Sequence, residues 1–323
     1  MESDVTDTAL LYGPVVDDIP RVADRLRGLS NGHHALLGDT LAYVFETEGK
    51  RIRPALVMLS GKLGSYDVGR LVTLAASLEV VHTATLVHDD TIDQALTRRG
   101  LRTINAVWNG KVAILVGDFL FAQSAHLAAQ LDSVRIMSLL SETVMAMSSG
   151  ELRQYASSEA RVIDEADYFQ RIAGKTASLF AMCCQGAAIV SGQPEHQIEA
   201  LRTYGTNLGL AFQIADDVLD FAGDETTLGK PAGSDLSQGT ITLPAILLAQ
   251  RLSPDSPVVA DLHSGRNAHR VVDAVRVSGV LDDALQRALE YAVAARSALS
   301  VFPDSDARDA LVHLADHVVN RRR

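Results

Sequence analysis

The segment HTATLVHDDTID, at residues 82–93, ends in three aspartates at positions i, i+1 and i+4: Asp89, Asp90 and Asp93. Apolar side chains recur at helical spacing before and within this segment, which predicts a largely buried helix. On such a helix Asp89 and Asp93 share a face about one turn apart, roughly 6 Å along the axis, with Asp90 on the flank. An ionised carboxylate is costly to bury without partners, so the end of this helix needs cations or hydrogen-bond donors around it.

The same pattern occurs again in GLAFQIADDVLD, at residues 209–220, which places Asp216, Asp217 and Asp220 at the end of a second apolar helix. One such triplet could equally be a solvated face, an N-cap cluster or a salt-bridge patch. Two copies favour a shared metal site, because carboxylates brought to one cavity repel each other unless cations lie between them. Mg²⁺ is the predicted ion, since hard divalent cations take oxygen ligands and leave room for water and substrate phosphate.

The composition favours an all-α protein with one domain. Of the 323 residues, 47% are hydrophobic and 5% aromatic, only 9 are proline, and no Pro/Gly/Ser-rich linker divides the chain. Alternating β-branched runs are scarce, whereas alanine and leucine are abundant, as in helices. The two cysteines, Cys183 and Cys184, are adjacent, so they lack the spacing of zinc ligands and are expected to be buried thiols. We therefore predict a single-domain helical bundle over residues 1–323.

Net charge and hydropathy limit which partners and which cellular location the protein is expected to have. The net charge of −11 argues against nucleic acid as a partner, although it leaves room for an anionic small ligand where basic residues cluster. No run of about 18 uncharged apolar residues occurs, which predicts no membrane span. The acidic start MESDVTDTAL does not resemble a signal peptide, and the expected location is cytoplasmic.

Four segments of the sequence carry basic side chains that could supply the positive charge needed by a phosphate-rich substrate of a metal site. In chain order they are EGKRIRP with Lys50, Arg51 and Arg53 ahead of Pro54, TRRG with Arg98 and Arg99, AGKTASLF with Lys175 and Thr176, and GDETTLGKPAGSDLSQGTITLP with Lys230. Taken singly, they could be a surface patch, an ordinary helix N-terminus or a solvated connector. Pro54 predicts a helix start, AGKTASLF is expected to begin an apolar helix, and the last group is typical of a loop that closes over an active site.

Two histidines precede the first aspartate triplet. His82 lies seven residues before Asp89, near the same helical face, and could donate to a phosphate. His88 adjoins Asp89 and could orient its carboxylate. For both histidines the alternative is a satisfied structural role in the core.

In this order, the motifs GKRIRP, HDDTID, TRRG, GKT, FQIADDVLD and GKPAGSDL resemble those of the trans-isoprenyl diphosphate synthases, also called polyprenyl synthetases. The likeness extends from about residue 40 to about residue 250 and is specific as a set. The resemblance implies an all-α bundle around a central prenyl cavity, with the two aspartate motifs facing each other across its mouth. It also implies several Mg²⁺ ions in each active site and a homodimer.

The resemblance implies a role for each motif residue. Mg²⁺ would be bound by the triplet carboxylates, Asp89, Asp90, Asp93, Asp216, Asp217 and Asp220. The allylic diphosphate would be held by Arg98, Lys175, Thr176, Gln213 and Lys230. Isopentenyl diphosphate would be held by Lys50, Arg53, His82 and Arg99. The residues implied to act in catalysis, by stabilising charge on the departing pyrophosphate, are Asp89, Asp90, Asp93, Lys175, Asp216, Asp217 and Lys230.

Two positions depart from the family pattern. Glu48 stands where many relatives have a second glycine before GKR, which bears on the flexibility of that loop. Thr240 replaces the lysine of a frequent GKxTLP pattern, which removes one possible diphosphate contact.

Small residues before the first triplet bear on product length. Thr85 and Ala84, four and five residues before Asp89, are predicted to lie below the metals, because helical side chains lean towards the N-terminus. In this family small residues there resemble an open shaft, which implies an all-trans product of hexaprenyl length or more that can be passed to a membrane. Val81, another turn down, is a candidate for the final stop. The alternative is that Ala84 is only a small helix-packing residue.

Other functions remain open at this point. A farnesyl or geranylgeranyl diphosphate synthase would share the motifs but have a floor in its shaft. A class I terpene cyclase also ionises a prenyl diphosphate on Mg²⁺, but carries an Asn/Ser/Glu motif in place of the second aspartate triplet. A non-catalytic synthase subunit need not retain both triplets, and this chain has both.

Overall fold

The structure is a computed structural model, and the residues it describes are 11–46, 51–98, 100–223 and 232–320. Over this part of the chain the protein is helical apart from one short hairpin, strands β1 (Thr97–Arg98) and β2 (Leu101–Arg102), which confirms the all-α prediction. Four residues named above lie outside the described residues: Glu48, Lys50, Arg99 and Lys230.

The chain divides into two compact units. Unit 1 comprises Met1–Val144, Met182–Arg202 and Val301–His313. Unit 2 comprises Met145–Ala181, Thr203–Ser300 and Leu314–Arg323. The single domain expected from the sequence stays a prediction.

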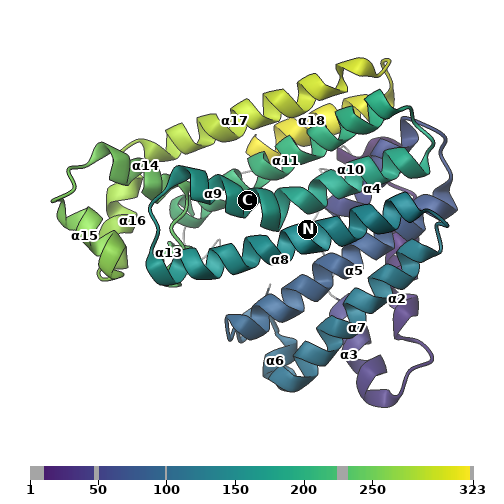
Figure 1. The fold of residues 1–323 in the computed structure, drawn as a ribbon, viewed down its shortest axis with the longest axis horizontal. Helices are drawn as coiled ribbons and strands as arrows, with labels where there is room; N and C mark the ends of the chain where they lie inside the picture. The colour runs from purple at the N-terminus through teal and green to yellow at the C-terminus, as the bar shows by residue number, and fades with distance from the viewer. Residues whose placement is uncertain (1–10, 47–50, 99, 224–231, 321–323) are drawn as a thin grey trace. The chain divides into compact units, whose positions relative to one another are not determined.

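Figure 1 labels the helices along the chain, and the two units divide them as follows. Unit 1 contains η1 (Gly13–Val15), α2 (Ile19–Arg27), η2 (Gly28–Ser30), α3 (Ala35–Glu46), α4 (Ile52–Lys62), α5 (Val68–Ile92), the hairpin, α6 (Ile104–Val107) and α7 (Gly110–Ala129). Unit 2 contains α9 (Glu165–Ile172), the π-helical turn η3 (Ala173–Ala177), α13 (Ser234–Ser237), α14 (Leu243–Arg251), α15 (Pro257–Ser264), α16 (Ala268–Val277) and α17 (Val280–Ala298). Elements with residues in both units are α8 (Val134–Ala160), α10 (Ser178–Val190), α11 (Glu195–Ala222), η4 (Leu299–Val301) and α18 (Asp306–Asn320).

Helix α5 is the central helix of unit 1. Its start is capped by Asp67, whose side chain accepts a hydrogen bond of 3.1 Å from the backbone N–H of Arg70. Every side chain from 74 to 81 is buried, because α2, α4 and α7 pack around this stretch. The stretch is apolar apart from Ser77 and Glu79, and a helix of this kind is stable only when enclosed in this way. From His82 onward one face of α5 regains accessible surface, and this face leads to the first aspartate triplet.

Helix α11 approaches the turn η3 and helix α10 closely in unit 2 because glycines line the contact. A Cβ on Gly205 would lie 2.5 Å from the carbonyl oxygen of Phe180, and one on Gly209 would lie 2.6 Å from Cα of Ala177. The missing side chains let the backbones approach closely. Since residues four apart share a helical face, Gln213 continues the same stripe towards the second triplet.

We expect Gly209→Ala to push α11 away from η3, because the new methyl group meets backbone that cannot yield. Overpacking of this kind costs about 1–3 kcal/mol, and it should be visible as a lower unfolding midpoint together with weaker substrate binding. Gly28→Ala is the matched control, because a Cβ there meets nothing within 4 Å and the backbone is right-handed. Equal stability of the two variants would contradict the packing argument.

Three helical segments are long and apolar enough to cross a membrane by length and composition alone: Val68–Ile92, Gly110–Ala129 and Glu165–Val190. In the first and third, more than half of the apolar window is buried within the protein. The second, α7, has only 39% of its window buried, so its apolar surface is the least covered of the three. The absence of a membrane span stays a prediction.

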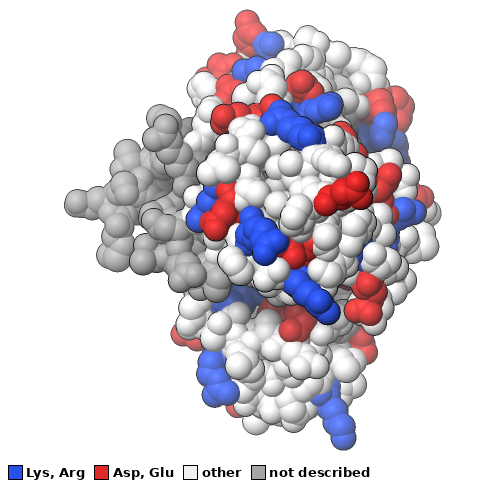
Figure 2. Space-filling model, turned by 90° about the vertical axis from the view of Figure 1, so that its left-hand side faces the viewer, with Lys and Arg blue, Asp and Glu red and all other residues white. Residues whose placement is uncertain are grey.

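Acidic and basic side chains are intermingled on the face shown in Figure 2. The ion pairs on the surface of the protein include Arg202 with Glu199 and Arg296 with Asp316. A nucleic-acid binding face would instead gather basic side chains into a field of one sign. The absence of a nucleic-acid partner stays a prediction.

Candidate active site

The first aspartate triplet lies at the C-terminal end of α5. Asp89 is half-buried and Asp93, which caps the helix end, is exposed. The two share the accessible face that begins at His82, so the predicted side-by-side placement of Asp89 and Asp93 holds in the structure. Asp90 points away from this face and is only 6% exposed.

Asp90 is paired with Arg98, which reaches back from strand β1. Nε and Nη2 of Arg98 lie 2.8 and 2.7 Å from Oδ1 of Asp90. The turn between them is fixed by the backbone N–H of Ala95, which donates to the carbonyl of Asp90 over 2.9 Å. The sequence assigned Arg98 to a diphosphate, and the structure adds that this guanidinium is held by a triplet carboxylate.

The second triplet lies near the end of α11, and its middle member is almost completely enclosed. Asp217 is 2% exposed. Its Oδ2 accepts a hydrogen bond of 2.6 Å from the hydroxyl of Tyr168, and its Oδ1 accepts one of 2.9 Å from Nε2 of Gln213. The pKa of Asp217 is raised to about 8, chiefly because the carboxyl group is buried and also because the carboxylates of Asp235 and Asp216 lie nearby, while the two hydrogen bonds lower it.

Asp220 connects the second triplet to the segment that follows it. Its backbone carbonyl accepts from the N–H of Gly233 over 2.9 Å, and its Oδ2 accepts from the N–H of Asp235 over 3.3 Å. Gly233 has a positive φ of 72°, which favours glycine at this turn. Asp220 therefore contributes to the position of α13, while Asp216 on the same helix is half-buried.

Lys175 and Thr176 lie in the π-helical turn η3. The expected helix start at this segment is wrong, because α9, η3 and α10 form one run from Glu165 to Val190. The turn is pressed against α8, where a Cβ on Gly174 would lie 2.8 Å from the carbonyl oxygen of Ala146. Single π-helical turns within α-helices occur often at functional sites, since they redirect side chains.

The side chains of this turn make specific polar contacts. Nζ of Lys175 lies 2.6 Å from Oε2 of Glu151 on α8. The hydroxyl of Thr176 donates to Oε1 of Gln213 over 2.7 Å. Together with the bonds to Asp217, this forms a continuous chain from Thr176 through Gln213 and Asp217 to Tyr168.

The described residues predicted to hold isopentenyl diphosphate lie on α4 and α5. Helix α4 begins at Ile52, which confirms the start indicated by Pro54, and Arg53 in its first turn is half-buried. Arg51 adopts a left-handed backbone with φ of 51°, and its Nη1 lies 3.1 Å from Oε2 of Glu79 on α5. Because α4 packs against α5, Arg53 and half-buried His82 lie on neighbouring helices of one unit.

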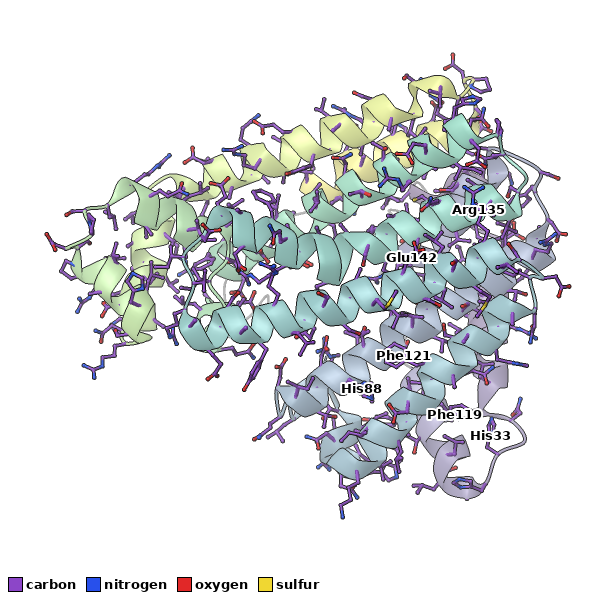
Figure 3. The ribbon with its side chains drawn as sticks, in the orientation of Figure 1. His33, His88, Phe119, Phe121, Arg135 and Glu142 are labelled. Atoms are coloured by element: carbon purple, nitrogen blue, oxygen red, sulfur yellow. The ribbon has the colours of Figure 1, made fainter. Side chains whose placement is uncertain are left out.

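His88 has the structural role that was one of its two predicted readings. Its Nε2 lies 3.1 Å from the carbonyl oxygen of Ile114 on α7, and its ring contacts Phe121 at 5.7 Å between centroids (Figure 3). A Cβ on Gly117 would overlap this imidazole. His88 therefore joins α5 to α7.

The candidate chain-length residues differ sharply in their surroundings. Ala84 and Val81 are 0% exposed, whereas Thr85 is half-buried and donates its hydroxyl to the carbonyl of His82 over 2.8 Å. At about 100° per residue, Ala84 is turned roughly 140° from Asp89, and Thr85 only about 40°. Ala84 and Val81 thus pack inside unit 1, which leaves Thr85 on the face below Asp89.

Two polar residues that contact motif residues were not predicted from the sequence: Tyr168 and Glu151. Tyr168 precedes Lys175 by seven residues, a spacing that places both on one side of a continuous helix and could have drawn attention to it. Glu151 carries no comparable signal, because its contact with Lys175 depends on the packing of α8 against η3.

The donor chemistry of the triplets fits a hard divalent cation. Asp89 and Asp93 present only oxygen donors on one accessible face, as Mg²⁺ and Ca²⁺ require. Among the described residues, no group of three or more His, Cys, Asp and Glu side chains is gathered closely enough to hold an ion without other ligands. Mg²⁺ commonly completes its shell with water and substrate phosphate, so it does not require a full set of protein ligands.

Comparison with known proteins agrees with these features. Residues 34–277 match the family model described as polyprenyl synthetase. A prenyl transferase of Synechocystis is 38% identical over 324 aligned positions, which cover 97% of this chain and 98% of the relative.

Two solved structures are similar along nearly their whole length. The polyprenyl synthase of Caulobacter crescentus, complexed with calcium and isoprenyl diphosphate, has a TM-score of 0.91 at 36% identity and covers 98% of each chain. A decaprenyl diphosphate synthase of Rhodobacter capsulatus has a TM-score of 0.91 at 33% identity and covers 98% of this chain and 99% of its own. Metal-dependent chemistry on isoprenyl diphosphates is thus consistent with the carboxylate and cationic side chains described above, and the chain belongs to the polyprenyl synthetase family, as a trans-prenyl diphosphate synthase.

Proposed function

We propose that this prenyltransferase uses Mg²⁺ to condense isopentenyl diphosphate with an allylic prenyl diphosphate, and that its all-trans product has six or more isoprene units. The observation that carries the proposal is that each aspartate triplet stands beside side chains suited to a diphosphate. Arg98 accompanies Asp90, and Lys175 lies in the turn that approaches the Asp217 helix. The calcium and isoprenyl diphosphate found with the Caulobacter relative support a metal-bound diphosphate here.

The chemistry requires that negative charge be stabilised as it grows on the leaving diphosphate. Mg²⁺, when bound, supplies positive charge to the diphosphate oxygens. Arg98, Lys175 and Lys230, the last of which lies outside the described residues, add fixed charge to the allylic diphosphate, and the allylic C–O bond breaks to a delocalised carbocation. The double bond of isopentenyl diphosphate then attacks C1 to form a C–C bond, and proton loss, with pyrophosphate as acceptor, leaves a longer allylic diphosphate.

The chain also orients the second substrate and excludes water from the reacting atoms. Isopentenyl diphosphate would be held by Arg53 and His82 together with Lys50 and Arg99, so that its double bond is fixed beside the allylic carbon. A dry site protects the carbocation from capture by water. We infer that the chain works as a single functional domain in the cytoplasm and delivers its apolar product to a membrane.

The deciding experiment is product sizing with purified enzyme, Mg²⁺, isopentenyl diphosphate and four separate primers: dimethylallyl, geranyl, farnesyl and geranylgeranyl diphosphate. A ladder that ends at six or more isoprene units is the expected result, and the decaprenyl enzyme of Rhodobacter capsulatus is a precedent among the relatives. A stop at four units or fewer would instead identify a farnesyl or geranylgeranyl type. A cyclic hydrocarbon, or no isopentenyl incorporation with any primer, would indicate a cyclase or a partner subunit.

The tail of the growing product is expected to pass Thr85. Thr85→Phe should shorten the products by one or more isoprene units, because a ring on the face of Asp89 would block the path below the metals. Thr83→Phe is the matched control, since Thr83 is also half-buried on α5 but turned about 120° from Asp89. Ala84→Phe should mainly destabilise the protein, by about 1–3 kcal/mol, because Ala84 has no accessible surface. An unchanged product ladder for Thr85→Phe would exclude this path.

We further propose that two copies associate through α7. Ile114 and Leu115 are 50% and 68% exposed on this helix, and exposed Lys111 and Asp118 flank them. In a two-fold antiparallel pairing centred between Ile114 and Leu115, Lys111 of each copy meets Asp118 of the other, so the surface is self-complementary.

Leu115→Asp is expected to convert the dimer to a monomer, because it places two carboxylates near the two-fold axis. Molar mass by light scattering during size exclusion is the measurement. Val277→Asp, at an 86% exposed valine that ends α16, is the control and should leave the mass unchanged. A wild-type chain that elutes as a monomer at micromolar concentration would rule the proposal out.

A further inference from the structure

The N-cap residue of helix α4, Arg51, departs from two local preferences. N-cap positions usually have an extended backbone and a side-chain oxygen that accepts a hydrogen bond from the first turn. Arg51 instead has a left-handed backbone, with φ of 51° and ψ of 35°, and its guanidinium has no acceptor atom. A left-handed conformation is unfavourable for a residue with a Cβ, and it persists only where the surrounding structure fixes it. An interaction outside its own segment is therefore needed to hold Arg51.

This interaction is a buried ion pair with helix α5. Nη1 of Arg51 lies 3.1 Å from Oε2 of Glu79, and the two side chains are 15% and 10% exposed. Glu79 is the charged residue within the enclosed stretch 74–81 of α5, and a carboxylate is costly to bury unless it is paired. The pair thus offsets the cost of burying Glu79 and keeps Arg51 in place.

Glu79 belongs to a larger enclosed cluster in unit 1. The pKa of the Tyr12 hydroxyl is raised, chiefly by burial and also by the carboxylate of Glu79. The pKa of the Cys183 thiol is raised as well, chiefly by burial and then by the neighbouring Cys184. Two charged groups also act on this thiol: Arg53 lowers its pKa and Glu79 raises it. Arg53 and Glu79 therefore lie around the same buried thiol, which brings Arg53 close to the ion pair.

The ion pair directly precedes, on each helix, a residue that is predicted to hold isopentenyl diphosphate. Arg53 follows Arg51 by two residues, in the first turn of α4. His82 follows Glu79 by three residues, on the same side of α5. Because α4 packs against α5, the pair joins the two helices within one turn of these side chains. The carbonyl of Arg51 accepts the N–H of Ala55 over 3.1 Å, so the backbone of Arg51 sets how α4 begins and where Arg53 points.

We propose that Arg51 and Glu79 are positioning residues for isopentenyl diphosphate: their buried ion pair holds the N-cap of α4 in its left-handed conformation and thereby directs Arg53, beside His82, towards the diphosphate. The inference rests on the proposed function for the identity of this ligand. Neither member of the pair touches the substrate. Arg51 and Arg53 belong to the same basic segment, but the charge of Arg51 is neutralised by Glu79.

The first test compares the two substrates in variants of the pair. Glu79→Gln and Arg51→Met should weaken binding of isopentenyl diphosphate, measured by calorimetric titration without a primer, by about tenfold. KM for farnesyl diphosphate should stay within about twofold of wild type. Glu195→Gln is the matched control, because Glu195 pairs with Arg135 on the surface of the same unit, and it should change neither value. A loss that is equal for both substrates, or a lower melting temperature without a selective loss, would indicate a purely structural role and overturn the inference.

The double variant separates positioning from direct contact. If the two residues act through their ion pair, Glu79→Gln combined with Arg51→Met should bind isopentenyl diphosphate no more weakly than either single variant, because the second change removes nothing further. Additive losses, about a hundredfold in the double variant, would show that Arg51 contacts the substrate itself and would overturn the inference.

The role of the backbone is tested at Arg51 in the Glu79→Gln background, where no buried charge is left unpaired. Glycine adopts the left-handed conformation without strain, whereas alanine does not. Arg51→Gly should therefore bind isopentenyl diphosphate about fivefold more tightly than Arg51→Ala. Equal affinities of the two variants would show that the left-handed N-cap does not direct Arg53.

Failure of the proposed function would appear in the unmodified enzyme, as absence of isopentenyl incorporation with every primer. Failure of the positioning role would appear in an active enzyme, as variants of Arg51 and Glu79 that bind isopentenyl diphosphate as tightly as wild type. Glu79→Gln retains the shape of the side chain, so this titration tests the role even if a variant of Arg51 does not fold.

Discussion

Asp89→Ala is expected to lower kcat/KM for chain elongation by about a thousandfold. A metal ion that neutralises a leaving diphosphate contributes several kcal/mol to transition-state stabilisation, and about 4 kcal/mol corresponds to a thousandfold in rate. Asp89 is the triplet residue that lies both on the accessible face of α5 and next to buried Asp90, which pairs with exposed Arg98. Steady-state kinetics with farnesyl and isopentenyl diphosphates at saturating Mg²⁺ would measure the loss.

The matched control is Asp39→Ala, at an exposed aspartate on α3 of the same unit. It removes the same charge from a helix without touching either triplet, so kcat/KM should stay within about twofold of wild type, as for ordinary surface substitutions. If Asp89→Ala kept more than a tenth of the wild-type kcat/KM, the first triplet would not be the metal site that the proposed function requires.

Asp217 is expected to make the metal-free protein less stable as the pH rises from about 4 to about 8. The pKa of its carboxyl group is raised from 3.8 in its ordinary state to about 8 in the folded protein. Between these two values the folded state binds a proton that the unfolded state has released, so the free energy of unfolding decreases with increasing pH. At its steepest, one group contributes about 1.4 kcal/mol per pH unit.

The measurement is urea unfolding at several pH values in the presence of EDTA. Asp217→Asn should flatten the decline, because an amide does not titrate, and its stability relative to wild type should improve towards pH 8. Asp39→Asn is the comparison, because it makes the same substitution at an exposed aspartate away from both triplets. A wild-type slope identical to that of Asp217→Asn would show that the buried carboxyl does not retain its proton in the folded state.

Much of the fold and of the motif placement follows from local sequence patterns. The helical class, the start of α4 near Pro54 and the position of both triplets at the ends of buried helices were all predicted, because helical periodicity and proline act over a few residues. The placement of Asp89 and Asp93 on one face follows from the same helical geometry.

Other features depend on contacts between distant segments. AGKTA forms a π-helical turn in which Gly174 lies against α8, and no pattern within the segment predicts that neighbour. Ala84 and Thr85 are adjacent small residues, yet one is enclosed and the other reaches the face of Asp89, because the packing of α2, α4 and α7 fixes which side of α5 is covered.

The sequence by itself determined the helical class, the two triplets, the basic motifs beside them and the family, because periodicity, spacing and residue type are local properties of the chain. Only the tertiary structure decided which carboxylates are buried and which side chains donate hydrogen bonds to them. Nothing in the sequence distinguishes Asp90 from Asp89, or Asp217 from Asp216. In the structure Asp90 pairs with Arg98 and Asp217 with Tyr168, and both partners come from other segments of the chain. A buried carboxylate takes its role from the donors that packing brings to it, and that information lies outside its own motif.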